Sequence, residues 1–295
     1  MIIFGAKETS LEGNVCFVMD NITNLYSDIA WIYDIEFGIV HPVPDVPFYL
    51  EYAVCQCGKD GMKGDILELG CGTGRVAMIL AENGFNVTGF DLSQPMLDVF
   101  RKKLSAIKST QPEIAERIKI IQNDMTNFSI ARKFSLIIAP FRVFQALPVQ
   151  EDFEKALIRV REHLSDDGIF IINIQNPDDD LFDEEFLRAE EFNDEIFDEK
   201  TGITIARYDC LERIDSLNQV IHGYYAYIAT YPDGHIKRLI EPLKLKYYYR
   251  NQLRDLMEYA GFKIIDEYSW YDKSPPDLNP PGSSEIIMVC KKIYK

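Results

Sequence analysis

The sequence predicts an α/β fold in which a mostly parallel sheet is covered by helices on both faces and carries an antiparallel insertion. Between residues 65 and 175, short apolar runs alternate with longer segments of helical periodicity, as in strand–helix units of a parallel sheet. The apolar runs are nearly continuous, as expected for strands buried on both faces. After residue 176 an acidic stretch and long alternating segments replace this pattern, which predicts antiparallel strands.

The predicted elements follow in a regular order, and several end at recognisable signals. Strands are expected at 65–70, 86–92, 118–124, 134–141 and 168–175, with helices at 74–84, 94–107 and 150–164. Ser93 is a typical N-cap for the second of these helices, and Pro95 fits its first turn. A helix at 248–262 ends at Gly261, and strands at 262–270 and 285–292 close the chain.

This order of elements divides the chain into three parts. Residues 1–60 contain an amphipathic, aromatic stretch, "LYSDIAWIYDIEF", followed by the proline-rich "HPVPDVP", which predicts an N-terminal helical cap. Residues 61–177 and 247–295 form the α/β core. Residues 178–246 form the insertion, whose last two strands are expected to meet at the turn Pro232-Asp233-Gly234.

The composition of the chain argues against several classes of function. The 295 residues carry a net charge of −16, and an acidic surface repels the phosphates that dominate nucleic-acid binding. No apolar window approaches the roughly 20 residues that span a bilayer, and the N-terminus lacks a secretory pattern, so we expect a cytoplasmic protein that binds neither nucleic acid nor membrane. The six cysteines form no CxxC pair, which predicts reduced thiols and no metal site.

A glycine-rich turn, "ILELGCGTGR" at residues 66–75, follows the first strand. Phosphate loops need a lysine followed by serine or threonine after the last glycine, whereas Arg75 and Val76 stand here. Glu68 at the strand end would repel a pyrophosphate but can meet an ammonium group. The turn and the helix N-terminus can still receive a carboxylate. A ligand with both groups is an amino acid, so we expect the methionine end of S-adenosylmethionine.

Two further strand ends support an adenosyl ligand. Asp91 lies 17 residues after Gly74, where a carboxylate can accept hydrogen bonds from both ribose hydroxyls, a feature that dinucleotide enzymes share. Met96 is placed to reach an adenine face, although a core methionine is nearly as good an interpretation. Asp124 could accept the adenine amino group beside the amide of Met125, or it could simply cap its turn.

At these residues the chain resembles the class I S-adenosylmethionine-dependent methyltransferase family. The resemblance rests on "LELGCGTGR", "VTGFDLSQPM", the "NDM" corner and "LIIAPFRVFQAL", and covers roughly residues 62–176 and 247–293. It implies a Rossmann-like seven-stranded sheet in the order 3-2-1-4-5-7-6 and S-adenosyl-L-methionine as cofactor. The implied cofactor contacts are Glu68, Gly70, Cys71, Gly72, Gly74 and Arg75 around the methionine, Asp91 at the ribose, Leu92 and Met96 beside the adenine, Asp124 and Met125 at its edge, and Ala139 to Phe141 beneath the sulfonium.

The same resemblance narrows the acceptor. Methyltransferases acting on base or glutamine nitrogens often carry Asn or Asp before Pro-Pro-Tyr after the fourth strand, where this chain reads "APFR" at 139–142. It looks more like the small-molecule branch, whose acceptors are amines or hydroxyls, including amino sugars and natural-product scaffolds. The insertion, by its position, is expected to cover the acceptor site.

Candidates for catalysis come from three parts of the chain. His222 is the first candidate for a general base, since imidazole titrates near neutrality, and His41 is the second. Tyr33 and Arg142 are candidates to position the acceptor. Further candidates for the acceptor pocket are Tyr26, Gln145, Tyr224, Tyr225 and Tyr227. The tyrosines favour a hydrophobic or cationic acceptor, but they could equally form the core of the insertion or a homodimer interface.

Two alternatives stay open on the sequence alone. An NAD(P)-dependent oxidoreductase shares the glycine turn and the acid after the second strand, but it does not account for Glu68 or the "NDM" corner. A non-catalytic protein that binds S-adenosylmethionine would share every cofactor motif, and only the absence of methyl transfer to any acceptor would distinguish it.

Overall fold

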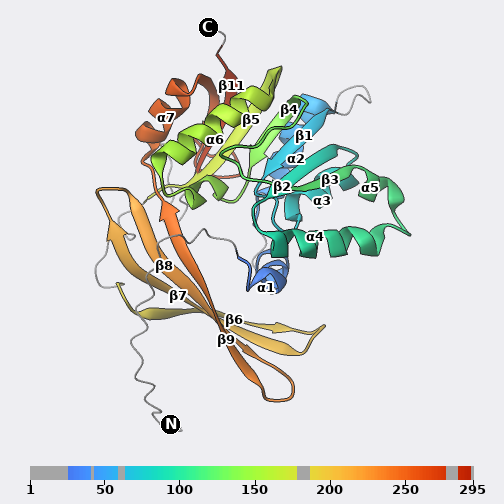
Figure 1. Cartoon of the computed structure of the whole chain (residues 1–295), viewed down its shortest axis with the longest axis vertical. Coiled ribbons are helices and arrows are strands. Elements are labelled where there is room, and N and C mark those ends of the chain that lie inside the picture. Colours follow the sequence, from blue (N-terminus) through green and yellow to red (C-terminus); the bar gives the residue numbers. More distant parts are fainter. Residues whose placement is uncertain (1–25, 41–42, 59–63, 178–186, 277–284, 294–295) are drawn as a thin grey trace.

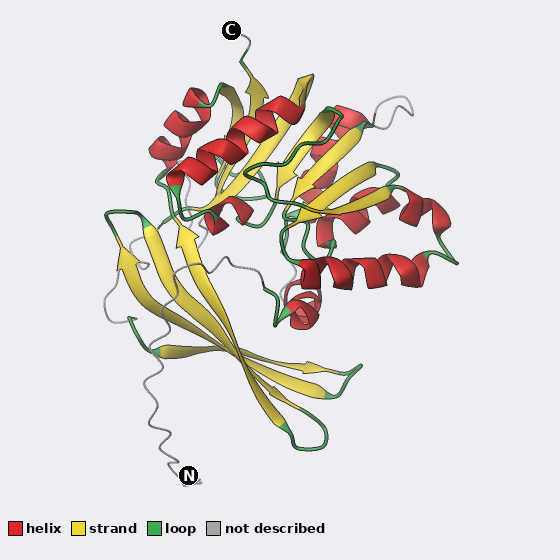
Figure 2. Ribbon diagram, in the orientation of Figure 1, coloured by secondary structure: helices red, strands yellow, loops and turns green. Residues whose placement is uncertain are grey.

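The computed structural model describes residues 26–40, 43–58, 64–177, 187–276 and 285–293. These form a seven-stranded sheet flanked by helices and a separate four-stranded sheet (Figure 1 and Figure 2). The strands of the larger sheet are β1 (Asp65–Leu69), β2 (Asn86–Asp91), β3 (Ile118–Gln122), β4 (Phe134–Ala139), β5 (Leu164–Gln175), β10 (Phe262–Tyr268) and β11 (Glu285–Lys292). Their order, β10-β11-β5-β4-β1-β2-β3, confirms the predicted Rossmann-like arrangement with an antiparallel final hairpin.

Two apolar layers cover the faces of this sheet. Its helices are α2 (Val46–Cys57), α3 (Arg75–Glu82), α4 (Gln94–Ile107), α5 (Pro112–Glu116), α6 (Gln150–His163) and α7 (Arg250–Tyr259). Side chains of α6 and α7 pack with Ile137 of β4 on one face, whereas those of α2, α3 and α4 pack with Leu136 and Ile138 on the other. Successive strand residues point to opposite faces, so the continuous apolar run of β4 is buried on both sides.

Most predicted elements are confirmed with bounds that shift by up to three residues, and two differences are larger. Strand β5 begins at Leu164, four residues before the predicted start, because Leu164 pairs with Phe134 across the ladder. The short helix α5 was not predicted, since its five residues, "PEIAE", are too few for helical periodicity to show.

The insertion is an antiparallel sheet in sequential order, β6-β7-β8-β9, which confirms the predicted pattern. Its strands are β6 (Glu190–Asp198), β7 (Ile203–Asp215), β8 (Val220–Thr230) and β9 (Ile236–Lys246). The turn predicted at Pro232 to Gly234 joins β8 to β9, and Gly234 has a φ of 82°. Within the predicted acidic segment, residues 178–186 lie outside the described part of the chain.

The N-terminal segment bridges the two sheets. It comprises α1 (Ala30–Asp34) and a π-helix, η1 (Ile35–Val40). Ile29 and Ile32 pack on the insertion beside Ile205 and Tyr227, and α1 also contacts α4. In Figure 1 it lies between the core and the insertion. A π-helical turn often marks a functional site, so this segment is the natural place to look for one wall of a pocket.

Two features bear on membranes and metals. Among the helices that the structure describes, none is long and apolar enough to cross a membrane. Within the same residues, no three histidine, cysteine, aspartate or glutamate side chains gather as a metal site. Cys55, Cys57, Cys71, Cys210 and Cys290 are free thiols, and Cys16 falls outside the described residues.

Candidate active site

The glycine turn after β1 has a conformation that residues with a side chain rarely adopt, in a place where a side chain would also clash. Gly70 has a φ of 66° and Gly74 a φ of 84°, in the left-handed region where a Cβ atom is strained. A Cβ on Gly70 would stand 2.2 Å from Cγ2 of Val143, and one on Gly74 would stand 2.2 Å from Cε2 of Phe100. The turn therefore folds tightly against its neighbours and delivers its amides to the start of α3.

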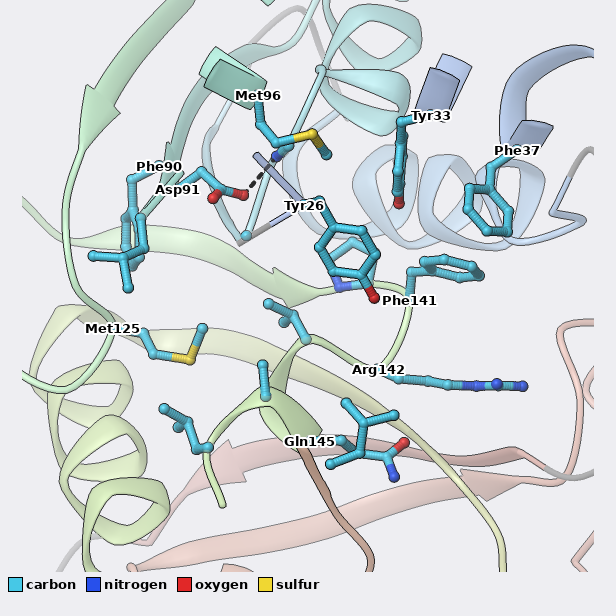
Figure 3. A pocket seen from close by; sticks show the side chains of 18 of the residues that line it. Tyr26, Tyr33, Phe37, Phe90, Asp91, Met96, Met125, Phe141, Arg142 and Gln145 are labelled. Carbon is cyan, nitrogen blue, oxygen red and sulfur yellow. Dashed lines mark hydrogen bonds between the residues drawn. The ribbon is translucent and has the colours of Figure 1, made fainter. Parts of the chain in front are cut away.

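Asp91, at the end of β2, holds this turn in place. Its Oδ2 accepts a hydrogen bond from the amide of Gly72 at 2.9 Å, and its Oδ1 accepts one from the amide of Ser93 at 2.8 Å (Figure 3). Burial raises the pKa of Asp91, while these amides work in the opposite direction. Each carboxylate oxygen has a second lone pair, so Asp91 can still accept two hydroxyl groups.

Glu68 lies beneath the turn and is 2% exposed. Its Oε2 has no hydrogen-bond partner among the described residues, and burial raises its pKa to about 8, although Arg75 acts in the opposite direction. A buried carboxyl oxygen without a partner is costly. The arrangement fits a ligand that brings an ammonium group to this strand end.

A cavity of about 290 Å³ lies where the turn, the ends of β2 and β4, the N-terminal segment and the insertion meet. Ten of the predicted site residues line it: Tyr33, Gly70, Gly72, Asp91, Leu92, Met96, Asp124, Met125, Phe141 and Arg142. The other six do not, namely Glu68, Cys71, Gly74, Arg75, Ala139 and His222. Most predicted cofactor positions thus come together around one space, although they lie on separate strands and loops.

An aromatic wall borders the cavity on the side of the N-terminal segment. The ring centroids of Tyr33 and Phe37 are 4.9 Å apart, and those of Phe37 and Phe141 are 5.0 Å apart. Tyr26 extends the row, with its ring 5.9 Å from that of Tyr33, and Figure 3 shows all four grouped together. Such a wall presents aromatic faces that attract a cation.

The N-terminal segment is tied to the cofactor side of the cavity by polar contacts. The hydroxyl of Thr73 in the glycine turn donates to Asp34 at 2.6 Å, and Nζ of Lys103 lies 2.9 Å from the same carboxylate. Arg75 makes a two-pronged ion pair with buried Asp45, at 2.5 and 2.7 Å. The ion pair holds Arg75 at the start of α2, where Asp45 is the N-cap residue, and Arg75 does not line the cavity.

Two arginines and a tyrosine also line the cavity, and Arg207 lies beside the aromatic wall, with Cζ 5.9 Å from the Phe37 ring centroid. Arg207 of β7 stacks over the ring of Tyr225, with Cζ 4.0 Å from the centroid, and it pairs with Glu36 of the π-helix and with Asp209. Arg142 follows β4 and pairs with Glu285. No sequence pattern marks Arg207 or Phe37 as a pocket residue, because the insertion and the π-helix meet only in the folded chain.

His222 lies apart from the cavity. It is on β8, and its Nε2 is 2.7 Å from Nη2 of Arg213, while partial burial and the nearby cations lower its pKa. Tyr224 donates to Glu190 at 2.9 Å instead of entering the cavity. His41 falls outside the described residues. The geometry therefore brings neither predicted base to the pocket.

Asp124 serves its own turn with one oxygen only. Its Oδ1 accepts hydrogen bonds from the amide and the hydroxyl of Thr126, both at 2.8 Å. The side chain therefore caps its turn, which is one of the two roles expected from the sequence, and it also lines the cavity. The two roles are compatible because a carboxylate offers two oxygens.

Comparison with known proteins agrees with this geometry. Residues 66–168 match a family model described as a methyltransferase domain. A putative methyltransferase of Geobacillus is 24% identical over 245 residues, covering 83% of this chain and 90% of that protein. The methyltransferase YqeM of Bacillus subtilis, also putative, is 32% identical over 136 residues, covering 46% of this chain and 49% of that protein.

Solved structures share the whole fold. The CcbJ methyltransferase of Streptomyces caelestis superposes with a TM-score of 0.72 at 23% identity. The superposition covers 93% of this chain and 100% of that chain. Residues 66–168 therefore form a methyltransferase domain of the class I S-adenosylmethionine-dependent type. The chain is an enzyme of methyl transfer with S-adenosylmethionine as cofactor, which sets aside the oxidoreductase and the non-catalytic alternatives.

Proposed function

We propose that this enzyme transfers the methyl group to an amine nitrogen of a small-molecule acceptor, with an amino sugar as the leading class. The observation that supports an amine is the chemistry of the cavity wall. Among the described residues that line it there is no histidine, lysine, glutamate or cysteine, and both aspartates, Asp91 and Asp124, lie at the cofactor end. A neutral amine attacks through its lone pair without a base, whereas a hydroxyl must lose its proton.

The tyrosines of the cavity do not supply that base. Burial raises the pKa of Tyr26, Tyr33 and Tyr225 above that of an ordinary phenol. Each hydroxyl therefore stays protonated near neutral pH and can only orient a ligand. Tyr33, Arg142 and Tyr225 are accordingly proposed as acceptor-positioning residues, and His222 is no longer proposed as a base.

The cofactor residues keep the roles that the sequence predicted, now as proposals supported by position. Glu68 and the turn from Gly70 to Gly74, including Cys71, would hold the methionine moiety, because the unpartnered Oε2 of Glu68 fits an ammonium group. Asp91 would bind the ribose. The adenine would lie between the side chains and loop ends that border the same side of the cavity, namely Leu92, Met96, Asp124 and Met125.

Two departures from the predicted cofactor contacts follow from the geometry. Arg75 is assigned to holding the turn through Asp45. Ala139 is fully buried in the core, whereas Pro140 and Phe141 line the cavity, so we propose that only Pro140 and Phe141 of the predicted residues 139–141 lie beneath the sulfonium.

When bound, S-adenosylmethionine would supply a methyl group activated by its sulfonium. The amine nitrogen would bond to that methyl carbon as the carbon–sulfur bond breaks, so that S-adenosylhomocysteine leaves and the methylated ammonium loses its proton to solvent. The chain contributes orientation and exclusion of water. The aromatic row formed by Tyr26, Tyr33, Phe37 and Phe141 closes one side of the cavity, and Arg207, Tyr225 and Arg142 complete the wall next to this row.

Relatives support both the preferred acceptor and its rival. A Streptomyces fradiae protein that is 29% identical over 107 residues is a dTDP-3-amino-3,6-dideoxy-alpha-D-glucopyranose N,N-dimethyltransferase. A sugar N-methyltransferase of Streptoalloteichus superposes with a TM-score of 0.65. Ubiquinone O-methyltransferases of Rickettsia match half of this chain, at 24–26% identity. The cavity without a base favours the amine.

The test is a panel of amino sugars, each paired with the sugar that has a hydroxyl in place of the amine. Release of S-adenosylhomocysteine and the mass of the methylated product are measured for each member of a pair. We expect methylation of the amines only, with kcat/KM rising with pH until the acceptor amine is neutral. Methylation of the hydroxyl partners instead would overturn the proposal. Asp91→Asn is the control, since it removes the ribose contact from the same fold.

A further inference from the structure

The turn after β4 has an unusual backbone. Phe141 has a φ of 51° and Arg142 a φ of 65°, so two consecutive residues with side chains occupy the left-handed region. Residues other than glycine rarely adopt this conformation, and a pair of them persists only where the surroundings hold it. Both side chains line the cavity, so whatever holds this turn also sets the shape of the active site.

Asn173 of β5 holds the backbone of the turn. The amide of Arg142 donates to its Oδ1 at 3.1 Å, and the hydroxyl of Tyr271 donates to the same oxygen at 3.0 Å. Asn173 is 0% exposed and stands in the strand sequence "IINIQ", among isoleucines. A buried amide in such a strand costs free energy unless it is fully bonded, and the sheet pairing itself does not need it.

Glu285, the first residue of β11, holds the side chain of the turn. Its Oε2 accepts a hydrogen bond from Nδ2 of Asn173 at 2.6 Å. Its Oε1 accepts one from Nε of Arg142 at 2.9 Å, and Nη2 of the same guanidinium donates to it as well. One carboxylate therefore links Asn173 to Arg142, and the four residues form a closed network that we call the β4-turn clamp: Arg142, Asn173, Tyr271 and Glu285.

We propose that Asn173, Glu285 and Tyr271 are positioning residues for methyl transfer, acting through the backbone of Arg142 and the ring of Phe141. The clamp fixes the left-handed turn, and the turn fixes the Phe141 ring against Phe37, where their centroids are 5.0 Å apart. None of the three positioning residues lines the cavity. Because an error of about 1 Å in positioning can cost about 100-fold in rate, they matter to turnover without touching a ligand. The effect on turnover rests on the proposed function; the effect on the turn does not.

The first experiment uses no acceptor. Amide hydrogen exchange, followed by mass spectrometry, is measured for the peptide spanning residues 139–147 in the full-length protein and in Asn173→Ala. The clamp predicts that the Arg142 amide, which donates to Asn173, exchanges at least about tenfold faster in the variant. Unchanged exchange in a folded variant overturns the proposal, whether or not an acceptor has been identified.

The second experiment separates positioning from binding. With an amine acceptor from the panel, Asn173→Ala should lower kcat by about 100-fold. The calorimetric Kd for S-adenosylhomocysteine should stay within about threefold, because the glycine turn and Asp91 are untouched. Equal loss of cofactor binding, or an unchanged kcat, would overturn the assignment.

A conservative substitution gives a signature that a merely structural role would lack. Asn173→Asp places a second carboxyl group 2.6 Å from Oε2 of Glu285, and such a pair can share one proton. The other titratable groups that interact with Glu285 are Arg142, Asp45, Tyr271 and Tyr49. The ratio of variant kcat to wild-type kcat should therefore rise as the pH falls, since the shared proton restores the lost hydrogen bond. A pH-independent ratio counts against the clamp.

A matched control is available on β10. Glu267 is also well buried and binds two arginines, Arg250 at 2.5 Å and Arg254 at 2.6 Å, but it does not line the cavity. Glu267→Gln breaks a comparable ion-pair network away from the turn. It should change neither the exchange of residues 139–147 nor kcat, and a matching effect from it would show that the clamp variants act through general destabilisation.

Discussion

Glu68 allows a quantitative test, because it couples pH to both stability and cofactor binding. Its pKa in the folded protein is about 8 against an ordinary value of 4.5, and burial is the main cause. A carboxyl group whose pKa is raised by folding binds its proton more tightly in the folded state. Its contribution to stability is therefore complete below the unfolded pKa and is lost as the pH rises towards about 8.

The size of this effect follows from the two pKa values. At 1.36 kcal/mol per tenfold change in proton affinity, the difference between 4.5 and about 8 corresponds to about 5 kcal/mol of unfolding free energy. Glu68→Gln has nearly the same shape and cannot ionise. Urea unfolding of both proteins at about pH 5 and about pH 8 should show a loss of several kcal/mol in the wild type that the variant lacks. Parallel pH dependences in the two proteins would refute the reasoning.

The same residue should make cofactor binding depend on pH. If the ionised carboxylate receives the ammonium group, the wild-type affinity for S-adenosylhomocysteine should strengthen about tenfold for each unit of pH between about 6 and about 8. The affinity of Glu68→Gln should be weak and should lack this dependence. Calorimetry at three pH values measures both, and an equally steep dependence in the variant would show that another group is responsible.

Three shorter predictions concern the turn, the pocket and the predicted base. Gly74→Ala places a Cβ 2.2 Å from the Phe100 ring, so urea unfolding should show a loss of about 2–5 kcal/mol, from left-handed strain and overpacking together. Glu36→Gln weakens the buried pair with Arg207, and the same assay should show a loss of about 1–3 kcal/mol together with a raised KM for the acceptor. His222→Ala should leave turnover unchanged, and a lost turnover would restore His222 as a catalytic candidate.

The cofactor half of the site could be predicted from the sequence because its residues are local to strand ends. In a parallel sheet the carboxyl ends of the strands meet at one edge, so Asp91 and Asp124, each recognised at the end of its own strand, had to come together. The glycine turn can also be recognised from its local sequence alone, without knowledge of the rest of the chain. Hydrophobic periodicity was enough to predict the longer covering helices and the strands of the larger sheet.

The acceptor half could be predicted only in part, because it is built from contacts between distant segments: Tyr33, Arg142 and Tyr225 were candidates and line the cavity, but others were not foreseen. Phe37 lies on a π-helical turn for which the sequence has no pattern, and Arg207 reaches the cavity only because β7 packs beneath that turn. His222 looked suitable by chemistry, but strand alternation directs it away from Tyr225 and Tyr227 on the same strand. Asn173 could have been noticed in the sequence, because a single amide side chain is unexpected within a buried apolar strand.

The division of the site into these two halves has a consequence for specificity. The cofactor half rests on β1, β2 and β3, whereas the acceptor half combines the N-terminal segment, the turn after β4 and the insertion. Glu36 and Arg207 join two of these parts through a buried ion pair, and Glu285 joins Arg142 to the final hairpin. A substitution in the insertion can therefore change which acceptor is bound without disturbing the residues on β1, β2 and β3, whereas loss of either buried carboxylate would disturb the geometry in which any acceptor must meet the methyl group.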